Sequence, residues 1–161
     1  MSDEQQRGLI LRAWMLREPG RLMGKGHPAG DFLEAYEWTL LEESAGVLRV
    51  RAHIPQHVRN PRGQLFGGFT PTYVDLVALL TVRAGEPREA RFRSWLATTN
   101  MRVDYFEPIV GPQFIIDSRL VKKRGRTNFV ETRFFDPEDT LAVFAVTTMR
   151  EVHLDRPLGD V

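Results

Sequence analysis

One carboxylate stands alone in the most apolar stretch of this sequence. Between Phe69 and Val82 the only formally charged residue is Asp75. Burying an ionised carboxylate is costly unless it is paired or hydrogen-bonded, and aspartate is a middling helix former, so neither burial nor helix propensity explains this residue. Two interpretations remain. Asp75 lies on an exposed or subunit-facing strip of a helix, or it points into a reaction cleft, where a carboxylate acts as a base or a nucleophile.

Two consecutive glycines, Gly67 and Gly68, lead into the apolar stretch. Glycine lets backbone N–H groups come close to a ligand, and the first N–H groups of a helix have no partner inside it. The helix dipole also favours negative charge at that end, so this arrangement is typical of an oxyanion hole. We expect a carboxylate two turns further on to reach the group that these N–H groups hold. A tight turn into the helix is the alternative explanation of the glycines.

The apolar stretch itself is predicted to be a buried helix. Thr70 is a suitable N-cap, Pro71 fits the first turn, and Gly85-Glu86-Pro87 ends the pattern. Apolar residues surround the axis on nearly every side, which is typical of a buried helix: Val74, Leu76, Val77, Ala78, Leu79, Leu80 and Val82.

Strands are predicted on both sides of this helix. A hairpin is expected from residues 35–43 (AYEWTLLEE) and 47–54 (VLRVRAHI), and the second segment alternates apolar and polar residues. Four strand-like runs follow the helix, at 94–106, 113–122, 128–135 and 140–151. Because short turns join the last three, they are predicted to form an antiparallel meander. The expected fold class is α+β, with a curved antiparallel sheet wrapped around one long central helix.

Length and composition fit one domain with an ordinary core. The chain has 161 residues, a net charge of +1 and no cysteine, which gives no case for general nucleic-acid binding and excludes disulfides and thiolate chemistry. No signal-peptide pattern and no apolar run of roughly 18 residues is present, so a cytoplasmic protein without a membrane partner is expected. We divide the chain into an N-terminal helix and loop extension (1–34, with a short helix over 3–17), a main domain (35–152) and a tail (153–161).

The segment from Asn60 to Asp75 resembles the hotdog-fold acyl-CoA thioesterases, in particular their phenylacetate-type (PaaI-like) branch. That branch carries an Asn, then His-Gly-Gly six positions later, then an acidic residue nine positions after the His. Here Asn60 is followed at those spacings by Phe66-Gly67-Gly68 and by Asp75. The runs TTNMRVDYFEPIVGP and RGRTNFVETRFFDPEDTLAVFAVTTM resemble later strands of the family, so the resemblance covers about residues 35–152.

The resemblance implies a role for each matching residue. Asp75 matches the carboxylate that acts as general base or nucleophile in thioester hydrolysis, and Gly67 matches the residue whose N–H polarises the thioester carbonyl. Asn60 and Thr98 match side chains that position the reacting groups or the water. In such proteins the cleft lies between two subunits, so the resemblance implies an obligate homodimer, with a dimer of dimers as the further expectation. Acyl-CoA is the implied substrate, and no cofactor or metal is implied.

One position departs from the family pattern, because Phe66 stands where the family has its histidine. Phenylalanine neither transfers a proton nor hydrogen-bonds a carbonyl, and a missing general acid or base costs about 10²–10⁴-fold in rate. Acyl-CoA thioesterase remains the predicted activity. Two alternatives on the same fold stay open: an acyl-CoA sensor without catalysis, and a hydratase or dehydratase, which would want an Asp/His pair in the site.

Further candidates concern substrate binding. Phe66 and Gly68 are expected to contact the substrate, and either of two basic groups could meet the CoA phosphates: Arg59 with Arg62, or Lys122, Lys123, Arg124 and Arg126. Leu65, Phe66, Phe69 and Tyr73 fit an apolar acyl pocket, and core packing explains them equally well. His53 and His57 make a poor metal pair because Pro55 lies between them, and His27 and His153 have no partner in the sequence.

Overall fold

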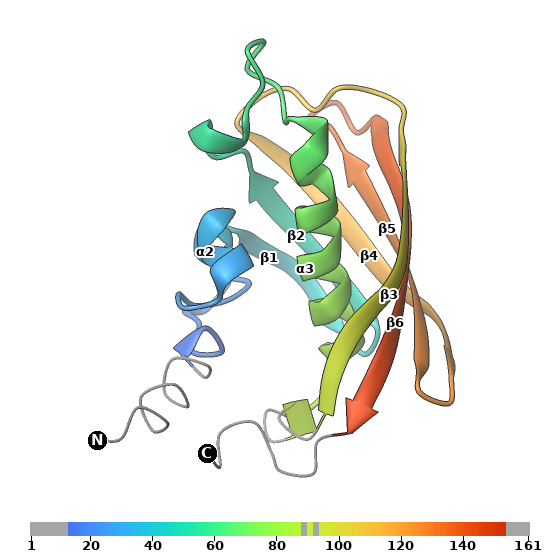
Figure 1. Cartoon of the computed structure of the whole chain (residues 1–161). Helices are drawn as coiled ribbons and strands as arrows, with labels where there is room; N and C mark the ends of the chain where they lie inside the picture. Colours follow the sequence, from blue (N-terminus) through green and yellow to red (C-terminus); the bar gives the residue numbers. More distant parts are fainter. Residues whose placement is uncertain (1–12, 88–89, 92–93, 154–161) are drawn as a thin grey trace.

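The computed structural model describes residues 13–87, 90–91 and 94–153. Its long helix, α3 (Thr70–Arg83), lies in the hollow of one curved antiparallel sheet (Figure 1). The strands are β1 (Thr39–Ser44), β2 (Val47–His53), β3 (Ser94–Tyr105), β4 (Gln113–Arg124), β5 (Thr127–Phe135) and β6 (Leu141–His153). They lie in the order β1-β2-β4-β5-β6-β3, so β1 and β3 form the two edges.

The predicted architecture is confirmed, including the meander of β4, β5 and β6. The four strands after the helix lie within two residues of their expected limits. The alternation in β2 is also confirmed, with Leu48, Val50 and Ala52 buried between more exposed neighbours. Side chains of one parity therefore face α3, as the two-residue repeat of a strand requires.

The first expected strand begins later than predicted. Ala35–Glu37 is a short 3-10 helix, η1, and the chain becomes extended only at Trp38, before β1. The reason is the burial of Trp38, whose indole N–H donates to the Leu33 carbonyl at 3.2 Å. Glu34 takes the left-handed conformation with φ 54°, which reverses the chain so that Trp38 enters the core.

The start of α3 also differs from the prediction. Phe69 occupies the N-cap position and no side chain caps the helix, because a 3-10 turn, η3 (Gly67–Phe69), runs directly into it. Thr70 already has helical geometry and is buried, so its predicted capping role is wrong. The helix is not covered on every side either. A half-buried stripe remains at Thr72, Asp75, Leu79 and Val82, spaced three or four residues apart.

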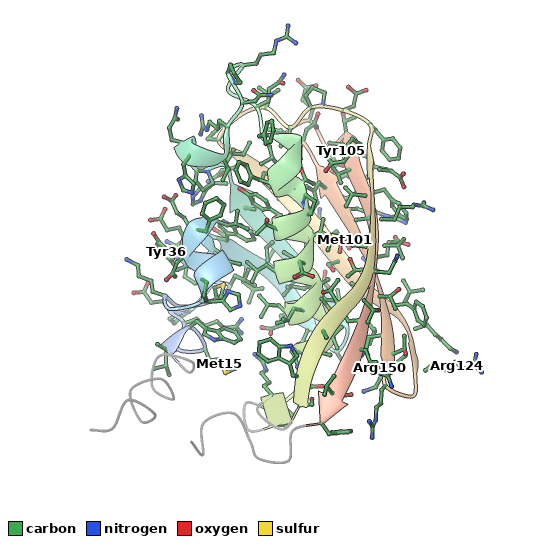
Figure 2. All side chains as sticks on the ribbon, in the orientation of Figure 1. Met15, Tyr36, Met101, Tyr105, Arg124 and Arg150 are labelled. Carbon is green, nitrogen blue, oxygen red and sulfur yellow. The ribbon has the colours of Figure 1, made fainter. Side chains whose placement is uncertain are left out.

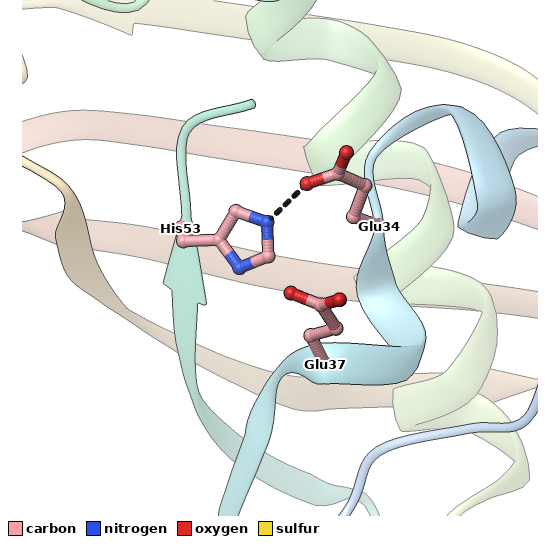
Figure 3. A group of neighbouring side chains, drawn as sticks. All are labelled: Glu34, Glu37 and His53. Atoms are coloured by element: carbon pink, nitrogen blue, oxygen red, sulfur yellow. Dashed lines mark hydrogen bonds and ion pairs between the residues drawn. The ribbon is translucent and has the colours of Figure 1, made fainter. Parts of the chain in front are cut away.

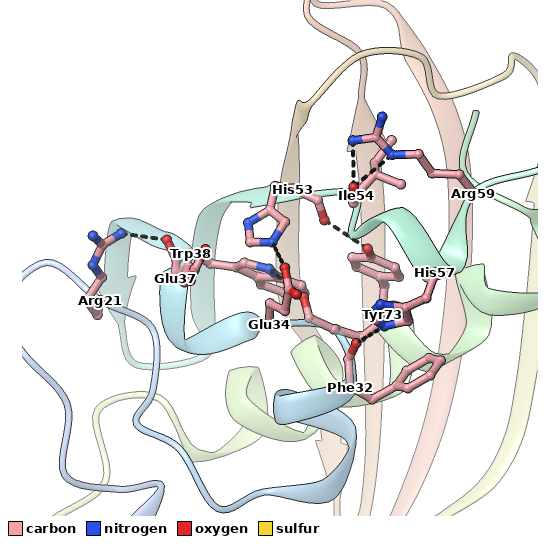
Figure 4. Close-up of polar contacts among 11 residues, drawn as sticks. Arg21, Phe32, Glu34, Glu37, Trp38, His53, Ile54, His57, Arg59 and Tyr73 are labelled. Carbon is pink, nitrogen blue, oxygen red and sulfur yellow. Dashed lines mark hydrogen bonds and ion pairs between the residues drawn. The ribbon is translucent and has the colours of Figure 1, made fainter. Parts of the chain in front are cut away.

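Aromatic rings pack the inner face of α3 against the sheet. Tyr73 stacks on Trp38 with ring centroids 5.3 Å apart and planes 4° from parallel, and it also contacts Phe114 and Phe134. Its hydroxyl donates to the His53 carbonyl at 2.8 Å (Figure 4). Burial raises the pKa of Tyr73, so the hydroxyl stays protonated and keeps this bond. Tyr73 is therefore a core residue rather than a pocket wall.

The N-terminal segment lies along the side of α3 opposite β3 (Figure 1). Leu22 and Met23 enter the core, and the Leu40 N–H donates to the Gly20 carbonyl at 2.8 Å, which ties the segment to β1. A short helix, α2 (Pro28–Phe32), follows it. Most of the helix predicted over 3–17 lies outside the described residues. None of the described helices is both long and apolar enough to span a bilayer.

Candidate active site

The structure brings Asp75 of α3 and Thr98 of β3 into direct contact. The Thr98 hydroxyl donates a hydrogen bond to Oδ1 of Asp75. The pairing of β3 with β6 shifts register between Thr98 and Asn100, and such a bulge re-aims the side chains beside it. Oδ2 of Asp75 has no hydrogen-bond partner in the described parts of the chain. One carboxylate oxygen is thus held in place and the other is available to accept a proton.

The glycine pair forms the 3-10 turn η3 before α3. Among the described residues, neither the Gly67 N–H nor the Gly68 N–H has an acceptor. The Tyr105 hydroxyl donates to the Gly67 carbonyl at 2.7 Å, and the Thr70 N–H donates to the same oxygen. Because the N–H of a trans peptide points opposite to its C=O, these bonds fix the direction in which the Gly68 N–H points. Two backbone donors are therefore held at the positive end of the helix dipole.

These donors and Asp75 lie well apart along one chain. Gly67 and Asp75 are eight residues apart along η3 and α3, which corresponds to about 12 Å at 1.5 Å per residue. The N–H groups and the carboxylate therefore do not lie side by side in one chain. The expectation that the carboxylate acts on a group held by such N–H groups stays a prediction.

Asn60 organises the loop before the turn. Its Oδ1 accepts from the N–H groups of Arg62 and Gln64 at 2.9 and 3.0 Å, and its Nδ2 donates to the Gln64 side chain at 3.1 Å. Arg59 is likewise engaged, because its guanidinium donates twice to the Ile54 carbonyl at 3.0 and 2.8 Å. One N–H of the Asn60 amide is left over, so its predicted role in positioning stays a prediction.

The Phe66 ring lies beside Gly68. The Phe66 side chain is half exposed, and a Cβ placed on Gly68 would lie 2.7 Å from the outer edge of its ring, which can move to relieve the contact. The ring also packs edge-to-face on Phe69, with centroids 5.7 Å apart. Gly68 itself remains exposed. Tyr105 was not predicted as a site residue, although its place at the end of a strand-like run was visible in the sequence.

The two basic groups lie at opposite ends of the sheet. Arg59 and Arg62 lie in the loop near the start of β4, whereas Arg124 and Arg126 flank the turn after its end. Figure 2 shows Arg124 at the end away from Tyr105 and the start of α3. Lys123 is already paired with Glu151 at 3.2 Å. One chain therefore does not bring both groups to one phosphate.

His27, which has no partner in the sequence, comes close to Asp75 in the fold. Burial lowers the pKa of His27, and the carboxylates of Asp31 and Asp75 oppose that shift. Its Nδ1 accepts from the Gly30 N–H at 3.1 Å, as the N-cap of α2. Asp75 is thus close enough to act electrostatically on an imidazole from the N-terminal segment. Nothing local in the sequence signals this approach.

A second histidine lies among carboxylates. One ligand atom each of Glu34, Glu37 and His53 lie within 4.8 Å of one another (Figure 3). The His53 Nε2 lies 2.7 Å from Glu34 Oε2, so a hydrogen-bonded pair between β2 and the residue that precedes η1 accounts for the contact. His57 contacts the Phe32 carbonyl instead, at 2.6 Å (Figure 4). The two histidines therefore have different partners.

The sheet wrapped around one helix, with a carboxylate on that helix, defines a hotdog-fold protein. The family model described as the Thioesterase superfamily matches residues 62–143, and the chain belongs to this family. No curated protein sequence matches the chain.

Solved structures with the same fold are distant in sequence. A thioesterase from Haemophilus influenzae shares 10% identity at a TM-score of 0.66, covering 80% of this chain and 85% of that one. A hypothetical thioesterase from Streptococcus pneumoniae, solved with coenzyme A, shares 15% at 0.62, covering 74% and 89%. A Streptococcus mutans protein bound to acetyl CoA shares 17% at 0.61, covering 74% and 92%. At these identities the likeness establishes the fold.

Proposed function

We propose that this protein is an acyl-CoA thioesterase of the phenylacetate-type (PaaI-like) branch. The observation that carries the proposal is the Asp75 carboxylate, which lies on the half-buried stripe of α3 and accepts a hydrogen bond from the Thr98 hydroxyl. The chain that holds it belongs to the Thioesterase superfamily. A carboxylate with one free oxygen has little structural use there. It fits a general base that takes a proton from water.

In the proposed reaction the thioester carbonyl accepts hydrogen bonds from the free N–H groups of Gly67 and Gly68. Asp75 removes a proton from water, and the water oxygen bonds to the carbonyl carbon. The oxyanion is stabilised by the two N–H groups and the helix dipole. When the carbonyl re-forms, the carbon–sulfur bond breaks, the thiolate of CoA leaves, and the proton from Asp75 neutralises it. Thr98 holds Asp75, and Asn60 is proposed to help orient the water.

The proposed site requires two copies of the chain. The separation of about 12 Å along the helix means that the N–H groups of one copy must serve the Asp75 of another. An edge strand supports this arrangement, because β3 pairs only with β6 among the described strands and is twelve residues long. Such an edge presents unpaired N–H and C=O groups that a second copy can satisfy. We propose a homodimer, and a dimer of dimers as its further assembly.

CoA is the proposed carrier of the acyl group. Support comes from the two structural neighbours solved with coenzyme A or acetyl CoA. In a dimer, Arg62 of one copy and Arg124 or Arg126 of the other are candidate phosphate contacts, since all three are exposed. The reaction as proposed uses water and these residues and no further cofactor.

Phe66 favours one alternative, a protein that binds acyl-CoA without turnover. Its ring stands where the resemblance places an imidazole, and it lies beside Gly68. Binding without hydrolysis would then leave Asp75 without a catalytic role. Substitution of Asp75 separates the two proposals.

The test is thiol release from a panel of aliphatic and aryl acyl-CoAs by the wild type and by Asp75→Asn, which keeps the shape and removes the base. We expect kcat to fall by about 10³-fold. Asp117→Asn is the matched control, because Asp117 lies on β4, inside the sheet and away from the β3 edge, pairs with Arg119 at 3.0 Å and has no place in the mechanism. Equal hydrolysis by the two variants would overturn the mechanism, and tight binding without wild-type turnover would establish the binder.

A further inference from the structure

A cavity of about 260 Å³ lies between the N-terminal segment and the second half of α3. Its walls include Leu79, which follows Asp75 by one turn on the same stripe, and Leu96, two residues before Thr98 on the same face of β3. Trp14 and His27 close it from the N-terminal segment. Asp75 and Thr98 do not line the cavity themselves, but one turn of helix, about 5.4 Å, separates Asp75 from the lining residue Leu79.

The size and lining of the cavity suit a small apolar group. A dry cavity of about 150 Å³ lined by aliphatic and aromatic side chains holds benzene. The present volume of about 260 Å³ therefore has room for an aryl group or a short acyl chain. Its position, one turn from the carboxylate, is where the acyl portion of a thioester would extend if the carbonyl carbon lay at Asp75.

Two polar side chains at the far end of the cavity, Arg83 and Ser94, are already paired. The Arg83 guanidinium donates to the Ser94 carbonyl and hydroxyl oxygens, both at 2.9 Å. The Ser94 hydroxyl in turn donates to Glu151 at 2.7 Å. The Arg91 guanidinium lies 3.7 Å from the Glu43 carboxylate, and its Nε is buried by protein atoms.

His27 is different, because its outer nitrogen has no partner among the described residues. Nδ1 accepts from the Gly30 N–H, so the proton of the neutral ring is on Nε2. Trp14 packs edge-to-face on the ring, with centroids 5.3 Å apart, and fixes its orientation. Burial lowers the pKa of His27, which keeps the imidazole neutral near pH 7. The cavity wall thus includes His27, whose Nε2–H is an unpaired donor among the described residues.

We propose that this cavity binds the acyl group and that Nε2–H of His27 selects acyl groups with an oxygen substituent, such as a hydroxyl or keto group near the thioester. The inference rests on the proposed function for the identity of the ligand. Its physical basis is that a plain hydrocarbon chain would bury the His27 N–H without an acceptor. A substituent oxygen restores that hydrogen bond, and sites built this way discriminate against analogues that lack the oxygen.

Two substitutions separate the role of His27 Nε2 as a hydrogen-bond donor from the role of His27 Nδ1 as the N-cap of α2. His27→Asn places an oxygen where Nδ1 accepts from Gly30, so it keeps the cap and removes the donor at Nε2. His27→Gln places an N–H near Nε2 and loses the cap. Both are made in the Asp75→Asn background, and calorimetry then measures Kd for hexanoyl-CoA and β-hydroxyhexanoyl-CoA without turnover.

We expect the Asp75→Asn protein with His27 intact, the parent, to bind β-hydroxyhexanoyl-CoA at least about tenfold more tightly than hexanoyl-CoA. His27→Asn should bring the ratio close to one at unchanged Tm, whereas His27→Gln should keep the preference at a lower Tm. Equal affinities in the parent, or a preference that survives in His27→Asn, would overturn the inference. Failure of the wild type to hydrolyse any thioester would overturn the proposed function alone, because the ratio of affinities is read independently of turnover.

Discussion

At the scale of single residues, the site depends on how Asp75 is held. The Thr98 hydroxyl donates a hydrogen bond to Oδ1, which fixes the orientation of the carboxylate, and Oδ2 is left to accept a proton. A hydrogen bond to a charged group is worth about 1.5–3 kcal/mol, which makes Thr98 the residue with the largest expected effect after Asp75 itself.

Thr98→Val removes the hydroxyl at nearly constant shape and should lower kcat about 10–100-fold, because Asp75 is no longer held for attack. Thr98→Ser keeps the hydroxyl and should retain most of the activity. Steady-state kinetics on one acyl-CoA, with Tm measured in parallel, check both. Equal rates for the Val and Ser variants would show that the contact has no part in catalysis.

Asp75, Gly67 and Thr98 were predicted as site residues because each keeps a recognisable spacing to its neighbours. His27 was not, because the packing of the N-terminal segment on α3, which brings it within electrostatic range of Asp75, has no signal in the sequence. Tyr105 shows the same limit, since its bond to the Gly67 carbonyl joins residues far apart in the chain. The spacing of residues predicts which side chains lie on one helix or strand, but it does not predict which helices, strands and loops come into contact.

At the scale of elements, the strands could be predicted from the alternation of apolar and polar residues and from the turn residues, and the helix from its apolar run. The local structure beside the candidate site could not be predicted in this way. The 3-10 turn before α3 displaced the predicted cap at Thr70, and the bulge after Thr98 depends on the pairing of β3 with β6. Both are set by the fit of one element on another.

Glu151 links four elements at the lower end of α3. On β6, it accepts from Ser94 of β3 at 2.7 Å and from Lys123 of β4 at 3.2 Å, and Arg83 of α3 lies 4.0 Å away. The hydrogen bond from Ser94 is the main reason that the pKa of Glu151 lies below its usual value of 4.5, with the Lys123 contact adding to it. The folded state therefore favours the charged form.

Glu151→Gln should lower the free energy of unfolding by about 1–2 kcal/mol at neutral pH. Because the folded pKa is depressed, this contribution is complete above the pKa of the unfolded chain and is lost as pH falls through the folded value. Urea unfolding of both proteins from about pH 7 to about pH 3.5 should show the difference closing in acid. Glu138→Gln, in the exposed turn before β6, is the control and should change neither value. A constant difference across this range would contradict the assignment.

At the scale of the whole molecule, the two groups of the proposed site lie apart in one chain. The N–H groups of Gly67 and Gly68 lie at one end of α3, and Asp75 lies about 12 Å along it. The long edge of β3 offers a surface for a second copy. Sequence resemblance implied a cleft shared by two subunits, and the length of helix between the two groups supports the proposal of a site made by two copies.

Two variants that are each inactive as homodimers should therefore regain activity when they form a heterodimer. Gly67→Pro removes a single N–H donor, and proline fits there because Gly67 opens a helical turn after an extended Phe66. Asp75→Asn removes the base. If each site combines Gly67 of one copy with Asp75 of the other, a heterodimer of these variants has one complete site and one doubly damaged site.

Co-expression with two different affinity tags isolates that heterodimer. We expect about half of the wild-type kcat per dimer, against near-zero turnover for either homodimer, because one of two sites is intact. An inactive heterodimer would place both halves of the site in the same chain, which the helix geometry forbids without rearrangement of η3. A wild-type chain that is active as a monomer in sedimentation would contradict the shared site directly, since no second copy would then supply the N–H groups.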